Sequence, residues 1–124
     1  MRIIFLLFLL LQADLSFAQT EYIFRITSAY TSFAEHYSDS SVLIIVPPQL
    51  KVKKQVDLVF WFHGWRNTID SSAEYFELAK QFLASNRNAV LVLPESAKNA
   101  PDSYGGKLEQ KDIFKLLLQD VLDK

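Results

Sequence analysis

The sequence predicts an α/β domain in which a mainly parallel sheet is flanked by helices. Three short apolar runs, at residues 42–46, 58–62 and 89–93, are each followed by a proline or by a histidine and a glycine. Runs of this length, rich in Val, Ile and Phe, are typical of strands buried on both faces of a parallel sheet. A segment with helical periodicity separates the second run from the third, and another follows the third. This alternation of strands and helices predicts the α/β class.

Two further elements complete the first part of the domain. Residues 22–27 alternate between polar and apolar side chains, which predicts an outer strand paired antiparallel with residues 42–46. Ser71 and Glu74 have the spacing of a capping box and predict the start of a helix. Its apolar side chains recur at helical spacing before Asn86 and Asn88 end it, and they are Tyr75, Leu78, Ala79, Phe82 and Leu83.

A last helix is predicted to begin between Glu109 and Asp112 and to run to Lys124. Its apolar face comprises Ile113, Leu116, Leu117 and Val121. Right-handed crossovers are expected to place both helices against the sheet. A unit of this order calls for another strand after its final helix.

The N-terminus has the layout of a signal peptide. A positively charged start precedes an apolar run over residues 3–11, and Ser16 and Ala18 supply the small residues of a cleavage site. We therefore expect a signal peptide at residues 1–18 and an exported domain at residues 19–124, in the periplasm or the medium. A membrane anchor is the alternative, but the apolar run is too short to span a bilayer. No stable anchor is expected after cleavage.

Composition argues against several classes of function. The net charge is −1 with both signs scattered, so no basic face for nucleic acid is expected. The lysine cluster at residues 51–54 is predicted to be a solvated turn. The absence of cysteine excludes disulfides and thiolate zinc sites. His36 and His63 are too far apart for a helical ligand pair and have no obvious third ligand, so neither a metal nor a cofactor is expected.

A candidate site lies in the segment His63-Gly64-Trp65-Arg66-Asn67, which follows an apolar strand and precedes the predicted helix. Loops at the carboxyl ends of strands are where open α/β sheets bind ligands. Glycine lets the backbone approach a substrate closely, and the N–H of the next residue can donate to a developing oxyanion.

These residues carry a resemblance to a known family. The stretch over residues 56–122, with Leu58-Val59-Phe60-Trp61-Phe62-His63-Gly64-Trp65 and Val90-Leu91-Val92-Leu93-Pro94-Glu95, resembles the N-terminal half of α/β-hydrolase-fold esterases. The resemblance implies that the backbone N–H of Trp65 is an oxyanion donor and that Gly64 permits its approach. It also implies that His63 orients the loop and is not the catalytic base.

The same resemblance implies an incomplete α/β-hydrolase fold, which lacks the nucleophile-elbow strand and everything after it. The elbow pattern G-x-S-x-G is absent because no two of Gly64, Gly105 and Gly106 are four residues apart. The family's acid and histidine come later in chain order, beyond Lys124. Ser96 lacks the flanking glycines of an elbow, so it is not expected to be a nucleophile.

The sequence therefore predicts the N-terminal part of an exported serine esterase that is inactive alone. A small ester or a carbohydrate ester is the expected substrate, with Arg66 and Glu95 near it, and a complementing C-terminal half is an expected partner. Two alternatives stay open: a small non-catalytic domain that binds a carbonyl or sugar ligand, and an inert fragment. The same strand-end geometry serves binding and catalysis, so these residues alone do not separate the alternatives.

Overall fold

The computed structural model describes residues 22–28, 35–102 and 104–124 of the chain. The predicted signal peptide at residues 1–18 lies outside the described residues. In the part of the chain that is described, no helix is both long enough and apolar enough to cross a membrane.

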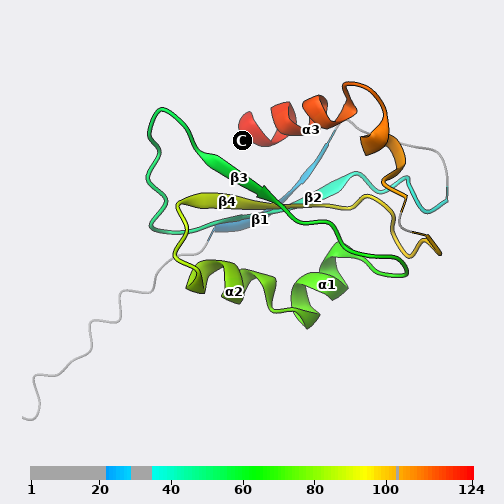
Figure 1. Ribbon diagram of the computed structural model, residues 1–124, viewed down its shortest axis with the longest axis horizontal. Helices are drawn as coiled ribbons and strands as arrows, with labels where there is room; N and C mark the ends of the chain where they lie inside the picture. Colours follow the sequence, from blue (N-terminus) through cyan, green and yellow to red (C-terminus); the bar gives the residue numbers. More distant parts are fainter. Residues whose placement is uncertain (1–21, 29–34, 103) are drawn as a thin grey trace, which may run out of the picture.

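Four strands form one sheet in the order β1-β2-β4-β3 (Figure 1). They are β1 (Tyr22–Thr27), β2 (Ser41–Val46), β3 (Asp57–Phe60) and β4 (Ala89–Pro94). The predicted antiparallel pairing of β1 with β2 is confirmed, with Phe24 opposite Ile44. β2 also pairs antiparallel with β4, whereas β3 and β4 are parallel, with Phe60 opposite Val92.

The predicted mainly parallel sheet is therefore wrong. The sheet is mixed, because two of its three pairings are antiparallel, and it is not the mainly parallel sheet of an incomplete α/β-hydrolase fold. Apolar runs do not determine strand direction. β2 and β4 are apolar because they occupy the two central positions between layers of helices, and burial on both faces does not depend on direction. β3 lies at an edge, where the side chain of Val59 is exposed.

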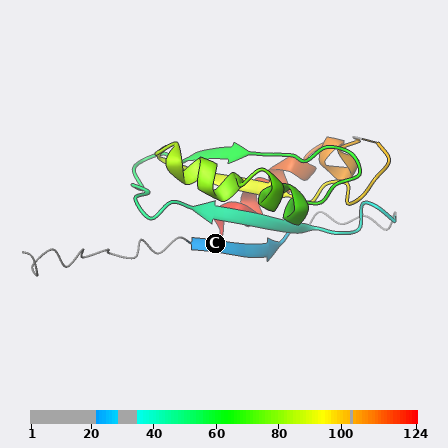
Figure 2. The same cartoon turned by 90° about the horizontal axis from the view of Figure 1, so that it is seen from below.

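Helices cover both faces of the sheet (Figures 1 and 2). One layer holds α1 (Ile69–Tyr75) and α2 (Leu78–Ala84), and the other holds the short 3₁₀ helix η1 (Gly106–Glu109) and α3 (Ile113–Leu122). The core beneath α3 contains Ile26, Val42, Ile44, Val90, Val92, Leu117 and Val121. The core beneath α1 and α2 contains Ile45, Ile69, Leu91 and Leu93, with Trp61, Leu78 and Phe82 packed against it.

The helix after β3 differs from the prediction at its start and in its middle. Its N-cap is Thr68, whose hydroxyl accepts from the Ser71 N–H, so the predicted capping box of Ser71 and Glu74 is wrong. The single predicted helix is two helices, because Glu77 adopts a left-handed conformation with φ 46°. The side chain of Phe76, the residue before this break, packs against Trp61, with 6.1 Å between ring centroids.

The last helix begins one residue after the predicted range, at Ile113. Leu117 and Val121 are buried and Ile113 packs against the core, as the apolar face predicted. Leu116 does not belong to that face, because its side chain is exposed.

Candidate functional site

Three loops meet at one end of the sheet. The loops after β3 and β4 lie at the same edge because these strands are parallel, and the segment before β2 joins them because β2 is antiparallel to β4. Backbone hydrogen bonds connect the three. The Arg66 N–H donates to the Ala100 carbonyl at 2.7 Å and the Asn99 N–H to the Asn67 carbonyl at 2.8 Å. The Lys98 N–H donates to the His36 carbonyl at 2.8 Å.

A buried pair of charged side chains lies at the base of these loops. The imidazole of His63 is 0% exposed, and its Nε2 contacts Oε1 of Glu95, whose side chain is 2% exposed. The second carboxylate oxygen of Glu95 accepts from the N–H of Ile69 at 3.0 Å. Glu95 thus connects the end of β4 with the loop after β3 and with the first residue of α1.

The protonation of His63 follows from its two partners. Nδ1 lies 2.7 Å from the Gly64 carbonyl oxygen and Nε2 faces the Glu95 carboxylate, so both ring nitrogens meet acceptors. Burial alone would lower the pKa of His63, but the hydrogen bonds to Glu95 and Gly64 and the charge of Glu95 raise it above its ordinary value. These contacts favour the imidazolium, with both nitrogens donating. His63 therefore has no ring nitrogen free to act as a base toward a substrate.

The Gly64–Trp65 peptide lies on the open side of this pair. A side chain added at Gly64 would meet no atom within 4 Å, and Trp65 is 63% exposed. Within the described residues, no acceptor meets the N–H of Trp65. Arg66 is held in a left-handed conformation with φ 50°, and its own N–H is bonded to Ala100. The Trp65 N–H is thus a backbone donor without an acceptor among the described residues, and the backbone next to it is held at Arg66.

The residues predicted from sequence are distributed between the surface and the interior. Gly64, Trp65 and Arg66 are exposed, whereas His63 and Glu95 are buried together. The carboxylate of Glu95, a residue predicted to lie near the substrate, bonds His63 and the Ile69 N–H, and its role toward a substrate stays a prediction.

The register of β3 against β4 brings His63 and Glu95 together, and the sequence alone does not give that register. Phe60 and Val92 face each other in the parallel ladder. His63 lies three residues after Phe60, and Glu95 lies three residues after Val92.

Ser96 has no catalytic partner among the described residues. Its side chain is half-buried. Neither histidine contacts it, because His63 bonds Gly64 and Glu95 and the ring of His36 bonds the Lys98 carbonyl.

Two surface contacts stiffen the outer loops. The hydroxyl of Tyr37 donates to Asp102 at 2.6 Å, which raises the pKa of Tyr37 to about 12. Lys98 Nζ lies 2.7 Å from Asp39. Partial burial alone would raise the pKa of Asp39, but hydrogen bonds from Lys98 and Ser41 lower it to about 2.

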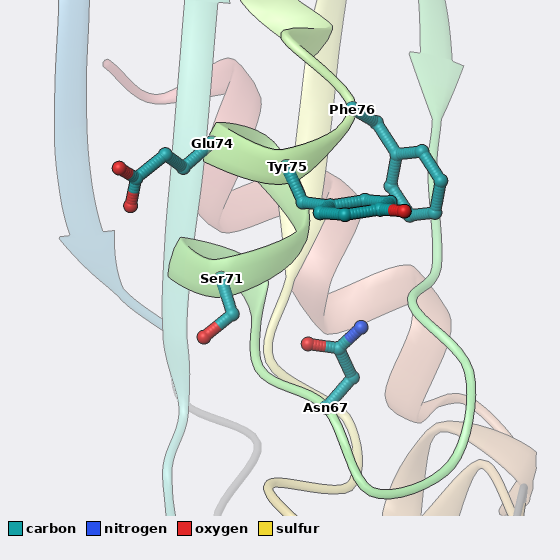
Figure 3. Close-up of a pocket in the computed structure, with 5 residues that line it drawn as sticks. All are labelled: Asn67, Ser71, Glu74, Tyr75 and Phe76. Carbon is teal, nitrogen blue, oxygen red and sulfur yellow. The ribbon is translucent and has the colours of Figure 1, made fainter.

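An open pocket with a volume of about 560 Å³ borders the loop where it enters α1 (Figure 3). It is lined by Asn67, Ser71, Glu74, Tyr75 and Phe76. No group of three His, Asp or Glu side chains that could hold a metal occurs within residues 22–28, 35–102 and 104–124.

Comparison of the chain with protein-family models, with curated proteins and with solved structures found no match. The chemistry of the loop therefore has to be inferred from its own residues and their geometry.

Proposed function

We propose that this chain supplies the oxyanion-binding loop of an exported serine-type hydrolase that cleaves carboxylic esters. The observation that carries the proposal is the N–H of Trp65, an exposed residue, which has no acceptor among the described residues. In ester cleavage the carbonyl oxygen gains negative charge as the tetrahedral intermediate forms. A fixed backbone donor stabilises that charge without reorganising, which is the largest single contribution in many acyl-transfer enzymes.

The surroundings of the donor support this role. The buried His63–Glu95 pair holds the residue before Gly64, and the Arg66 N–H holds the residue after Trp65. Both flanks of the donor peptide are thus fixed by hydrogen bonds. His63 is a positioning residue in this proposal, since both of its ring nitrogens are occupied.

The proposal assigns the nucleophile, the base and the acid to residues outside this sequence, because the chain contains no G-x-S-x-G elbow. A complementing polypeptide would need a place to bind beside the loop. β3 offers one, because within the described residues it pairs only with β4 and leaves its other edge free. Addition of a strand at that edge would bring new residues next to the carboxyl end of β3.

The test is a titration of the ¹⁵N-labelled chain with methylphosphonate, a tetrahedral anion that resembles the charged intermediate. We expect the Trp65 amide resonance to move most, with a dissociation constant on the order of millimolar for so small a ligand. Two variants form a matched pair. Trp65→Ala keeps the N–H and should retain binding, whereas Trp65→Pro removes the N–H and should abolish it.

Equal binding by the two variants would contradict the proposal, because the donor would then be another group. The circular dichroism spectrum of each variant checks that the loss of binding is not a loss of fold. Export is tested separately by the mass of the protein recovered outside the cytoplasm, which should lack residues 1–18.

A further inference from the structure

Two aromatic side chains are exposed on the solvent side of α1. Tyr75 is 82% exposed and Phe76 is 44% exposed. Their rings meet edge to face with 4.9 Å between centroids, and Phe76 also contacts Trp61. Phe76 is therefore anchored on the protein and holds Tyr75 in place. Neighbouring exposed aromatic side chains with a polar rim are typical of a binding site.

Polar groups of known direction lie beside these rings. The Thr68 N–H donates to the side-chain oxygen of Asn67 at 2.9 Å, so the amide nitrogen of Asn67 is left for the pocket. Figure 3 shows this nitrogen directed toward Tyr75, whose ring is seen edge-on above it. The Ser71 hydroxyl accepts from the Thr68 hydroxyl at 3.1 Å and keeps its own proton for another acceptor.

The arrangement fits a neutral sugar ring better than a cation. A saccharide has an apolar C–H face that packs on an aromatic ring and hydroxyl oxygens at its edge that accept from N–H and O–H donors. The pocket supplies one such ring and, in the amide nitrogen of Asn67, one donor directed toward it (Figure 3). A cation can also bind over the face of a tyrosine ring, but the one carboxylate that lines the pocket, Glu74, points away from Tyr75 and Phe76 and adds no charge complementarity there (Figure 3).

We propose that the pocket lined by Asn67, Ser71 and Tyr75 binds a saccharide. The sugar ring would stack on Tyr75, with a hydroxyl oxygen accepting from the Asn67 amide. Asn67 belongs to the same loop as Trp65, the proposed oxyanion donor. As a statement that the substrate is a carbohydrate ester, the inference rests on the proposed function, whereas saccharide binding itself does not.

The test is a titration of the ¹⁵N-labelled chain with cellotriose, xylotriose and chitotriose, with tetramethylammonium as the cationic probe. We expect at least one trisaccharide to move the amide resonances of Asn67, Ser71 and Tyr75. Tyr75→Ala should weaken binding by at least about tenfold, because it removes the stacking surface. Tyr75→Phe keeps that surface and should bind within about twofold of the unaltered chain. Both variants should fold, since Tyr75 is almost fully exposed.

Three results would overturn the inference. The first is that no trisaccharide moves these amide resonances at tens of millimolar. The second is that Tyr75→Ala binds a trisaccharide as well as the unaltered chain does. The third is that tetramethylammonium binds and no trisaccharide does. The methylphosphonate titration separates this inference from the proposed function. If the chain binds a saccharide but not methylphosphonate, it is a carbohydrate-binding domain and the proposed function is wrong. If it binds methylphosphonate but no saccharide, it has an oxyanion loop and its substrate is not a sugar ester.

Discussion

The carboxylate of Glu95 and the imidazole of His63 form a buried pair that fixes the loop after β3 to the end of β4. The second carboxylate oxygen of Glu95 accepts from the Ile69 N–H, so this one side chain connects a strand, a loop and a helix. A charged pair inside a protein is strongly destabilising when one partner is removed, because the other charge is left without compensation. The pair should therefore dominate the response of this protein to pH and to substitution.

Stability should fall as the pH rises above about 6.5. The pKa of His63 in the folded chain is raised above its ordinary value of 6.5, so the folded state binds the proton more tightly than the unfolded state does. This contribution is fully present below the unfolded pKa and is lost as the pH rises through the folded pKa. Urea unfolding at a series of pH values measures it.

Glu95→Gln should cost about 3 kcal/mol in the free energy of unfolding. It should also reverse the pH slope, because burial then acts on His63 without the carboxylate that offsets it. Glu74→Gln is the matched control, since Glu74 is exposed. A slope that is the same in both variants would show that the pair does not set the pH response.

Two substitutions on α1 should have opposite effects. Thr68→Ala removes the N-cap that accepts from the Ser71 N–H and should cost about 1 kcal/mol. Ser72→Ala removes a fully buried hydroxyl that has no hydrogen-bond partner among the described residues, and it should stabilise the protein by about 1 kcal/mol. Urea unfolding of the two variants gives both values. A destabilised Ser72→Ala would mean that the hydroxyl has a partner in solution.

Leu93→Ala should cost between about 2 and 5 kcal/mol, because Leu93 is 0% exposed at the centre of the core beneath α1 and α2. Leu122→Ala makes the same chemical change at a side chain that is 67% exposed, and it should alter stability by less than about 0.5 kcal/mol. Thermal and urea denaturation compare the two. Similar losses would place Leu122 in a buried contact.

One of the five tyrosines should ionise late. The hydrogen bond to Asp102 raises the pKa of Tyr37 from 10.0 to about 12. Phenolate absorbance followed to high pH should show this separate step. Asp102→Asn should move the step toward 10, and Asp57→Asn is a control on a carboxylate far from Tyr37. An unchanged step in Asp102→Asn would assign the late ionisation to another tyrosine.

The chain alone should not hydrolyse p-nitrophenyl butyrate through Ser96. Neither histidine contacts Ser96, so nothing described here would accept its proton. Ser96→Ala should therefore leave any slow background rate unchanged. Hydrolysis that persists through purification and disappears in Ser96→Ala would contradict the assignment of the nucleophile to residues outside this sequence.

The sequence predicted where the strands lie and the antiparallel pairing of β1 with β2, but not the antiparallel pairing of β2 with β4. Residues 42–46 and 89–93 fall within β2 and β4, because runs of Val, Ile and Leu bounded by proline have little alternative to a buried strand. Strand direction was not predictable from these runs, since a central strand is buried on both faces in either direction. The break at Glu77 lies next to the contact of Phe76 with Trp61, a tertiary contact that helical periodicity does not contain.

Part of the candidate site could likewise be predicted from the sequence, and part could not. The position of Gly64 and Trp65 at the carboxyl end of a strand followed from the local pattern, whereas the pairing of His63 with Glu95 required the register of two strands. Phe60 faces Val92, and the equal offset of three residues then brings the imidazole and the carboxylate together. The roles of Trp65, Gly64 and Arg66 stay predictions.

The free edge of β3 has a consequence for how the protein behaves at high concentration. A strand that bonds a neighbour on one side carries unpaired N–H and C=O groups on the other. In this protein the exposed side chain of Val59 lies on β3, and that of Phe62 lies two residues after its end. Such an edge is a template for strands of other molecules, and neither a charged side chain nor a proline interrupts Leu58, Val59 and Phe60. Self-association should begin there, so dilution or a charge introduced at Val59 should keep the chain monomeric.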